Sequence, residues 1–180
     1  MKLWDTATGS EVKTLSWCEG GVRAVAFAPD GKRIASGGVG GVMQIWDLAS
    51  GDEVASLRGQ EGVTQGLAWT PDGRRLLSVS RDHSLMAWDL ATGREAWRVE
   101  AHDRDPLCLA LTPDGAIAAT GGEEGTLALW NAATGALVAR VGEATGDSVR
   151  SLAISADGGR LLAGTTRGWI RCYDLPARAR

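Results

Sequence analysis

A short motif returns along the whole chain at a nearly constant interval, and this repeat constrains the fold more than any other feature. An aromatic residue followed by Asp or Asn recurs every 42 or 43 residues, at Trp4, Trp46, Trp88, Trp130 and Tyr173. Two further markers keep the same register: Pro-Asp-Gly, with Ala156 replacing the proline in the last repeat, and Ala-Thr-Gly, with Ser50 replacing one threonine. Three markers in one register predict about four copies of one structural unit.

Each period contains apolar runs that are too short for helices and are bounded by turn residues. In the first full period these runs span residues 22–27, 33–36 and 42–46, which predicts strands. Proline presets the first corner of a turn and glycine adopts the left-handed conformation, so Pro-Asp-Gly predicts a hairpin between the first two strands. One such small sheet cannot bury both of its faces alone, so neighbouring units are expected to stack.

These Trp-Asp pairs, Pro-Asp-Gly hairpins and Thr-Gly turns resemble WD40 repeats over essentially the whole chain. The resemblance implies an all-β fold, a β-propeller built from four-stranded antiparallel blades. It adds a fourth strand near residues 53–57 to the first full blade, and residues 1–180 form a single domain of about four blades.

The number of blades and the two chain ends raise the question of how the ring closes. Closed propellers have about 4 to 8 blades, and four blades of this family would make a strained ring. The chain opens with a third-type strand at 1–4 and a fourth-type strand at 11–15, and its last predicted strand, 169–173, is of the third type. The N-terminal segment could supply the missing strand, as ring closure in this family does, which would leave residues 1–5 redundant. A segment of a longer protein and a half-propeller completed by a second copy are the alternatives.

The resemblance also implies a buried hydrogen-bonded tetrad in each blade. The third blade nearly completes it with His102, Thr120, Glu124 and Trp130, and the second approximates it with Gln60, Ser78, Asp82 and Trp88. The first blade has Cys18 and Gly40 at the His and Asp positions, and the fourth has Thr145 and Arg167, so neither is expected to form it. Both histidines therefore have structural explanations, since His83 falls in an exposed turn.

Family partners usually meet the rim of the central channel, which predicts an interaction site by register. Its residues are Arg23, Val39, Gln65, Arg81, Asp105, Leu107, Glu123, Arg150 and Thr166. Arginine forks suit carboxylates, so an acidic peptide segment is the expected partner. The simpler alternative is that these arginines are ordinary solvated surface in a chain with 19 Lys and Arg, of which only 3 are Lys. That bias suggests a GC-rich bacterial gene.

Composition and motif searches argue against other functions. A net charge of −3 disfavours nucleic acid and anionic membranes as partners, and neither a spanning segment nor a secretion signal is seen, so a cytoplasmic protein is expected. No hydrolase, metalloprotease or phosphate-loop motif occurs, so no enzyme activity, metal or cofactor is expected. Glu100, Asp103 and Asp105 form an acidic cluster that is expected to be a solvated loop. Cys18, Cys108 and Cys172 are expected to be buried, and Trp17, Trp97 and Trp169 to pack between blades.

The function that follows is a non-enzymatic scaffold that presents a propeller rim to a protein or peptide. A sensor or structural module within a larger bacterial regulatory protein is one alternative. A half-propeller that closes by homodimerisation is the other.

Overall fold

The computed structural model describes residues 1–15, 21–142 and 144–176, and this part of the chain contains seventeen strands and no helix. The prediction of an all-β fold is therefore confirmed. In chain order the strands are β1 (Lys2–Trp4), β2 (Glu11–Thr14), β3 (Val22–Phe27), β4 (Arg33–Gly38), β5 (Met43–Asp47), β6 (Glu53–Leu57), β7 (Thr64–Trp69), β8 (Arg75–Ser80), β9 (Ser84–Asp89), β10 (Arg94–Glu100), β11 (Pro106–Leu111), β12 (Ile117–Gly122), β13 (Leu127–Asn131), β14 (Leu137–Val141), β15 (Val149–Ile154), β16 (Arg160–Thr165) and β17 (Ile170–Asp174).

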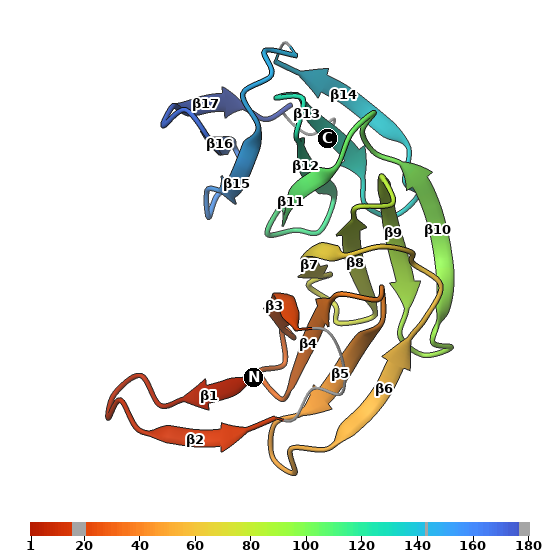
Figure 1. Cartoon of the computed structure of the whole chain (residues 1–180), viewed down its shortest axis with the longest axis vertical. Coiled ribbons are helices and arrows are strands. Elements are labelled where there is room, and N and C mark those ends of the chain that lie inside the picture. The colour runs from red at the N-terminus through yellow and green to blue at the C-terminus, as the bar shows by residue number, and fades with distance from the viewer. Residues whose placement is uncertain (16–20, 143, 177–180) are drawn as a thin grey trace.

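The strands form five antiparallel sheets in chain order. Three are complete four-stranded blades, which we call blade 1 (β3–β6), blade 2 (β7–β10) and blade 3 (β11–β14). Blade 4 has three strands, β15–β17, and the N-terminal pair β1–β2 forms a sheet of its own. The sheets follow an open arc, with β3, β7, β11 and β15 on its inner side and β6, β10 and β14 on its outer side (Figure 1). The fold is a partial β-propeller.

The Pro-Asp-Gly hairpins have the predicted geometry. Gly31, Gly73, Gly115 and Gly158 lie at the end of these turns with φ between 66° and 74°, a conformation that costs glycine little. The aspartate adds a second restraint, because the Asp30 carboxylate accepts a hydrogen bond from the Lys32 backbone at 2.8 Å. Each turn therefore joins the inner strand of a blade to the next strand.

The aspartate of each Trp-Asp pair holds the following turn. Asp47 Oδ1 accepts from the backbone N–H groups of Ala49 at 3.0 Å and Ser50 at 2.8 Å. These hydrogen bonds, first that from Ser50, lower the pKa of Asp47. Gly51 then takes a φ of 86° and closes the reversal into β6. Asn131 makes the same two backbone contacts in blade 3, which explains how it substitutes for aspartate.

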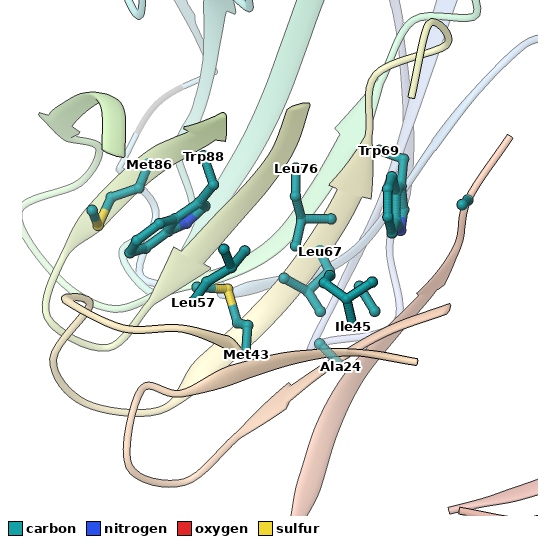
Figure 2. Packing of buried hydrophobic residues seen from close by; sticks show 11 residues of the cluster. Ala24, Met43, Ile45, Leu57, Leu67, Trp69, Leu76, Met86 and Trp88 are labelled. Atoms are coloured by element: carbon teal, nitrogen blue, oxygen red, sulfur yellow. The ribbon is translucent and has the colours of Figure 1, made fainter. Parts of the chain in front are cut away.

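Stacked blades bury the apolar core between them. Between blades 1 and 2, side chains from β3, β5 and β6 pack against side chains from β7, β8 and β9 (Figure 2). Met43, Leu57, Leu76 and Trp88 are almost wholly enclosed there. The Trp69 indole also crosses this interface and donates a hydrogen bond to the Ala26 carbonyl at 3.0 Å. Apolar stacking, as expected for such small sheets, joins one blade to the next.

The chain ends differ from the expected ring closure. Among the described residues β2 pairs only with β1, and β17 pairs only with β16. The two sheets lie at opposite ends of the arc (Figure 1). The N-terminal segment instead covers the outer part of blade 1, where Leu15 and Met1 pack against Ile34 and Trp46. The prediction that it completes the last blade within the same chain is therefore wrong.

Two predictions of burial also need correction. Cys108 is buried, whereas Cys172 is exposed on β17. Trp97 packs between blades 2 and 3 as predicted, whereas Trp169 is 64% exposed at the free end of blade 4. Cys172 lies on the face of blade 4 that a further blade would cover, whereas Trp169 lies in the connection between β16 and β17. Trp17 and Cys18 lie outside the described residues.

Candidate functional site

The predicted rim residues occupy equivalent places in the four blades because the backbone pairs them. The residue that follows the second strand donates its N–H to a carbonyl just before or at the start of the inner strand. The four pairs are Val39 to Gly21, Arg81 to Val63, Glu123 to Asp105 and Thr166 to Ser148, at 3.3, 3.1, 2.9 and 3.0 Å. Arg23, Gln65, Leu107 and Arg150 lie two residues further along the inner strands. The rim therefore follows one edge of the arc.

A charge cluster joins the rims of blades 2 and 3. Arg81 Nε lies 3.4 Å from Asp105 Oδ2, and His83 Nε2 lies 3.7 Å from Asp105 Oδ1. With its amide oxygen turned toward Arg81, Gln65 accepts from Arg81 Nε at 2.6 Å. Arg81 is thus partly neutralised within the chain and offers less free positive charge than its position alone suggests.

The remaining rim residues differ in how far they are free to meet a partner. Glu123 faces Arg104 at 3.9 Å, and Thr166 Oγ1 donates to Asp147 Oδ1 at 3.0 Å. Arg23 and Arg150 are exposed, and so is Val39, whose N–H donates to the Gly21 carbonyl two residues before Arg23. Within the described residues neither arginine has a carboxylate within ion-pair distance, so the free positive charge of the rim lies on blades 1 and 4.

A continuous hydrogen-bonded chain runs through the interior of blade 3. Trp130 Nε1 donates to Thr120 Oγ1 at 2.9 Å, and this hydroxyl lies 2.8 Å from His102 Nε2. The other imidazole nitrogen, His102 Nδ1, lies 2.5 Å from Glu124 Oε1. With Nδ1 protonated, the imidazole donates to Glu124 and accepts from Thr120. The network links the inner strand's leading loop to the second and third strands of the blade.

The environment of this network keeps the imidazole neutral and the carboxylate ionised. Burial lowers the pKa of His102, although the contact with Glu124 opposes the shift. Burial raises the pKa of Glu124, but hydrogen bonds from Thr126, the backbone and His102 outweigh it, so the pKa is lowered overall. A charge-assisted hydrogen bond between a neutral donor and an anion results.

The amino-acid sequences of these repeated units identify the protein family. The model of the WD domain, G-beta repeat, matches residues 9–47, 51–89 and 93–131. The chain belongs to the WD40 repeat family. Each matched unit begins at or near a Thr-Gly or Ser-Gly turn and ends on the Asp or Asn that follows the tryptophan. No curated protein matches the chain. WD40 domains generally act as protein-interaction scaffolds and are typically not enzymes.

The WD40 tetrad of blade 2 is split into two parts. Trp88 Nε1 donates to Ser78 Oγ at 2.9 Å, as in blade 3. Gln60 Nε2, however, donates to Ser84 Oγ at 2.9 Å, and this hydroxyl in turn donates to Asp82 Oδ1 at 2.6 Å. Gln60 Oε1 is buried without a partner. The shorter, non-aromatic amide thus reaches the turn but does not join it to the tryptophan.

The other two blades keep only parts of the WD40 network. In blade 1, Trp46 Nε1 donates to Ser36 Oγ at 2.8 Å. In blade 4, Asp147 accepts from Thr165 Oγ1 at 2.6 Å and from the Arg167 backbone at 2.9 Å. Burial raises the pKa of Asp147, but these hydrogen bonds lower it overall. Sequence reasoning missed Asp147 because it lies two residues beyond the position that the family motif assigns to histidine.

Metal or small-molecule chemistry has little support in the described part of the chain. No group of three His, Cys, Asp or Glu side chains there is placed to hold a metal ion. Two hollows lie between successive Pro-Asp-Gly hairpins, one beside Pro71 and Gly115 and the next beside Pro113 and Gly158. Both are at the opposite end of the strands from the rim. No helix long and apolar enough to cross a membrane occurs among the described residues.

Acidification is expected to destabilise this WD40 domain through His102. The folded-state pKa of His102 is lowered from 6.5, so below that pH the unfolded chain binds a proton that the folded chain does not. Stability should therefore fall as the pH drops from 7 to 5, by at most about 1.4 kcal/mol per pH unit from this residue. Urea unfolding at half-unit pH steps would measure it. The His102→Gln variant should show a weaker dependence of stability on pH. A stability that increases as the pH drops from 7 to 5 would contradict a lowered pKa for His102.

Proposed function

We propose that this WD40 domain is a non-enzymatic scaffold whose rim binds an acidic segment of a protein or peptide. The observation that carries the proposal is that Arg23 and Arg150 have no ion pair with any described residue, on a rim whose other charged side chains are paired. Arginine presents a rigid fork of donors to carboxylates. Val39, 43% exposed beside the backbone of Gly21, adds an apolar contact.

The pairing of Arg81 supports a division of roles along the rim. Asp105 and Gln65 hold Arg81 between blades 2 and 3. An acidic segment would have to displace Asp105 to use this guanidinium, whereas Arg23 and Arg150 need no such exchange. We therefore assign Arg23 and Arg150 to partner contact and Arg81 mainly to orienting the rim. Location in the cytoplasm and bacterial origin remain predictions from the sequence.

Charge reversal tests this proposal directly. Fluorescence anisotropy with a labelled peptide of alternating Glu and Gly measures binding to the intact chain, with a Lys and Gly peptide as the control ligand. Arg23→Glu combined with Arg150→Glu should weaken binding tenfold or more, which corresponds to about 1.4 kcal/mol. Raising the salt concentration should weaken binding of the unmodified chain as well.

A matched variant separates a specific site from general charge. Arg94→Glu makes the same charge change as either one of the two rim substitutions, at an exposed position on the start of β10 and away from the rim, and should leave the affinity nearly unchanged. Equal losses in all variants, or no binding of the acidic peptide by the unmodified chain, would overturn the proposal.

A second candidate function is self-assembly of the partial propeller. It is favoured by the exposed apolar surface at both ends of the arc, where Phe27 is 60% and Ile170 is 78% exposed.

A further inference from the structure

Every blade of this chain has two faces with different partners in the arc. We call the face toward the next blade along the chain the outgoing face and the other the incoming face. Between blades 1 and 2, the outgoing face includes Ala35, Met43 and Ile45, and the incoming face includes Leu67 and Trp69. These residues are at most 9% exposed. Side chains at the same register positions can therefore be compared at the two ends of the arc.

The N-terminal pair covers the outer part of the incoming face of blade 1, whereas the inner part of this face and the outgoing face of blade 4 are left open. Val25 and Phe27, at the positions of Leu67 and Trp69, are 53% and 60% exposed. Leu162 and Ile170, at the positions of Ala35 and Met43, are 44% and 78% exposed. A shallow hollow lined by Ala153, Leu162 and Cys172 lies on the same outgoing face. Each end thus has the half of an inter-blade core that the other end lacks.

The strands present at the two ends of the arc also complement each other. Blade 4 has its first three strands and no neighbour on the outer edge of β17 in the described chain. The N-terminal pair consists of a third strand, β1, and a fourth strand, β2, without the two inner strands. Because Trp4 and Tyr173 hold the same repeat position, β1 and β17 are equivalent strands. A blade built from β15, β16, β17 and β2 would be complete, and β1 would be displaced.

Side-chain charges fit this exchange. Lys2 lies two residues before Trp4, and its Nζ contacts Glu11 Oε2 at 2.5 Å. Gln44 makes the corresponding hydrogen bond to Glu53 in blade 1. The residue at this position in β17 is Arg171, which would replace Lys2 as the cationic partner of Glu11. Ile170 and Cys172 would likewise take the places of Met1 and Leu3 over blade 1.

We propose that β17 of one copy displaces β1 of a second copy and pairs with its β2. The outgoing face of blade 4 then packs on the incoming face of blade 1 of the second copy. Repeating the junction once closes a two-fold symmetric ring. Four blades from each copy give about eight blades, which lies within the range of closed propellers. This inference goes beyond the proposed rim function and does not depend on it.

Solution mass tests the assembly on the full chain. Light scattering behind a sizing column, over a hundredfold range of concentration, should give a species of twice 18.8 kDa. Deleting residues 2–5 removes the strand that competes with β17, so the truncated chain should dimerise at tenfold or more lower concentration. A monomer at all concentrations, a trimer, or a truncation that abolishes the dimer would overturn the proposal.

A disulfide trap tests the register. Leu3 pairs with Lys13 in the β1–β2 ladder, so Cys172 should lie opposite Lys13 of the other copy, close enough for a disulfide after a small adjustment. Lys13→Cys, in a Cys18→Ser background, should therefore give a covalent dimer under mild oxidation. Cys108 will not compete, because burial raises its pKa to about 12.

Two matched variants control this trap. Thr14→Cys places the thiol on the opposite face of β2, since neighbouring strand residues alternate in direction, and should cross-link far less. Adding Cys172→Ser to Lys13→Cys should abolish the covalent dimer. Equal cross-linking by Lys13→Cys and Thr14→Cys would contradict the proposed register.

Discussion

Replacing Trp88 by alanine should destabilise the protein by about 3–5 kcal/mol. Its side chain is 1% exposed and fills the interface between blades 1 and 2, against Met43 and Leu57 (Figure 2). The substitution also removes the Nε1 hydrogen bond to Ser78, which leaves a buried hydroxyl without its donor. For a domain of this size the melting temperature should fall by about 6–20 °C, as measured by calorimetry or circular dichroism.

The chain contains its own control for this prediction. Trp4 has the same place in the repeat but is 53% exposed, because none of the described sheets packs against it. Trp4→Ala should therefore cost less than about 1 kcal/mol. If Trp88→Ala does not fold, Trp88→Phe keeps most of the apolar volume and should give an intermediate loss. Similar losses for Trp4→Ala and Trp88→Ala would show that the blade interface does not dominate stability.

Replacing His102 by leucine should cost about 3 kcal/mol. The imidazole is fully enclosed and joins Thr120 to Glu124, and its loss leaves a partly buried carboxylate with fewer donors. Urea unfolding monitored by tryptophan fluorescence measures the change in the free energy of unfolding. Because Trp130 is tied to the same network, its emission should also respond.

Blade 2 suggests the matched variant for this test. Gln60 stands at the position of His102, and its amide donates to Ser84, whose counterpart in blade 3 is Thr126. His102→Gln should therefore recover a donor toward the turn and cost roughly half as much as His102→Leu, on the scale of one net buried hydrogen bond. A smaller loss for the leucine variant would indicate that packing, and not the hydrogen-bonded chain, sets stability here.

Much of the fold could be predicted because the turns of each repeat contain glycine and proline, which favour particular backbone conformations. Glycine at the left-handed corner and proline before it fixed the hairpins, and the spacing of Trp46 and Trp88 fixed the length of a blade. The four residues assigned to the blade 3 network are joined by hydrogen bonds in the structure for the same reason, since register places them on two adjacent strands and in the neighbouring loop and turn.

What could not be predicted depends on contacts that register alone does not encode. Asp147 serves the turn of blade 4 from a displaced loop position, because its two oxygens reach Thr165 and the Arg167 backbone. The pairing of Arg81 with Asp105 depends on the separation of two neighbouring blades, which no single repeat specifies. The position of the N-terminal pair depends on whether β2 pairs with β1 or with the equivalent strand β17, and the local sequence is compatible with both pairings.

That choice makes assembly a competition between tethered and free strands. A short turn connects β1 to β2 (Figure 1), so β1 is present beside β2 at an effective concentration on the order of millimolar. In the exchange that we propose, β17 of another copy can displace β1 at protein concentrations below this value only because the junction also buries the apolar face that contains Ile170 and Leu162. The cell's copy number of this protein, and not a chemical signal, would then determine when the ring is complete.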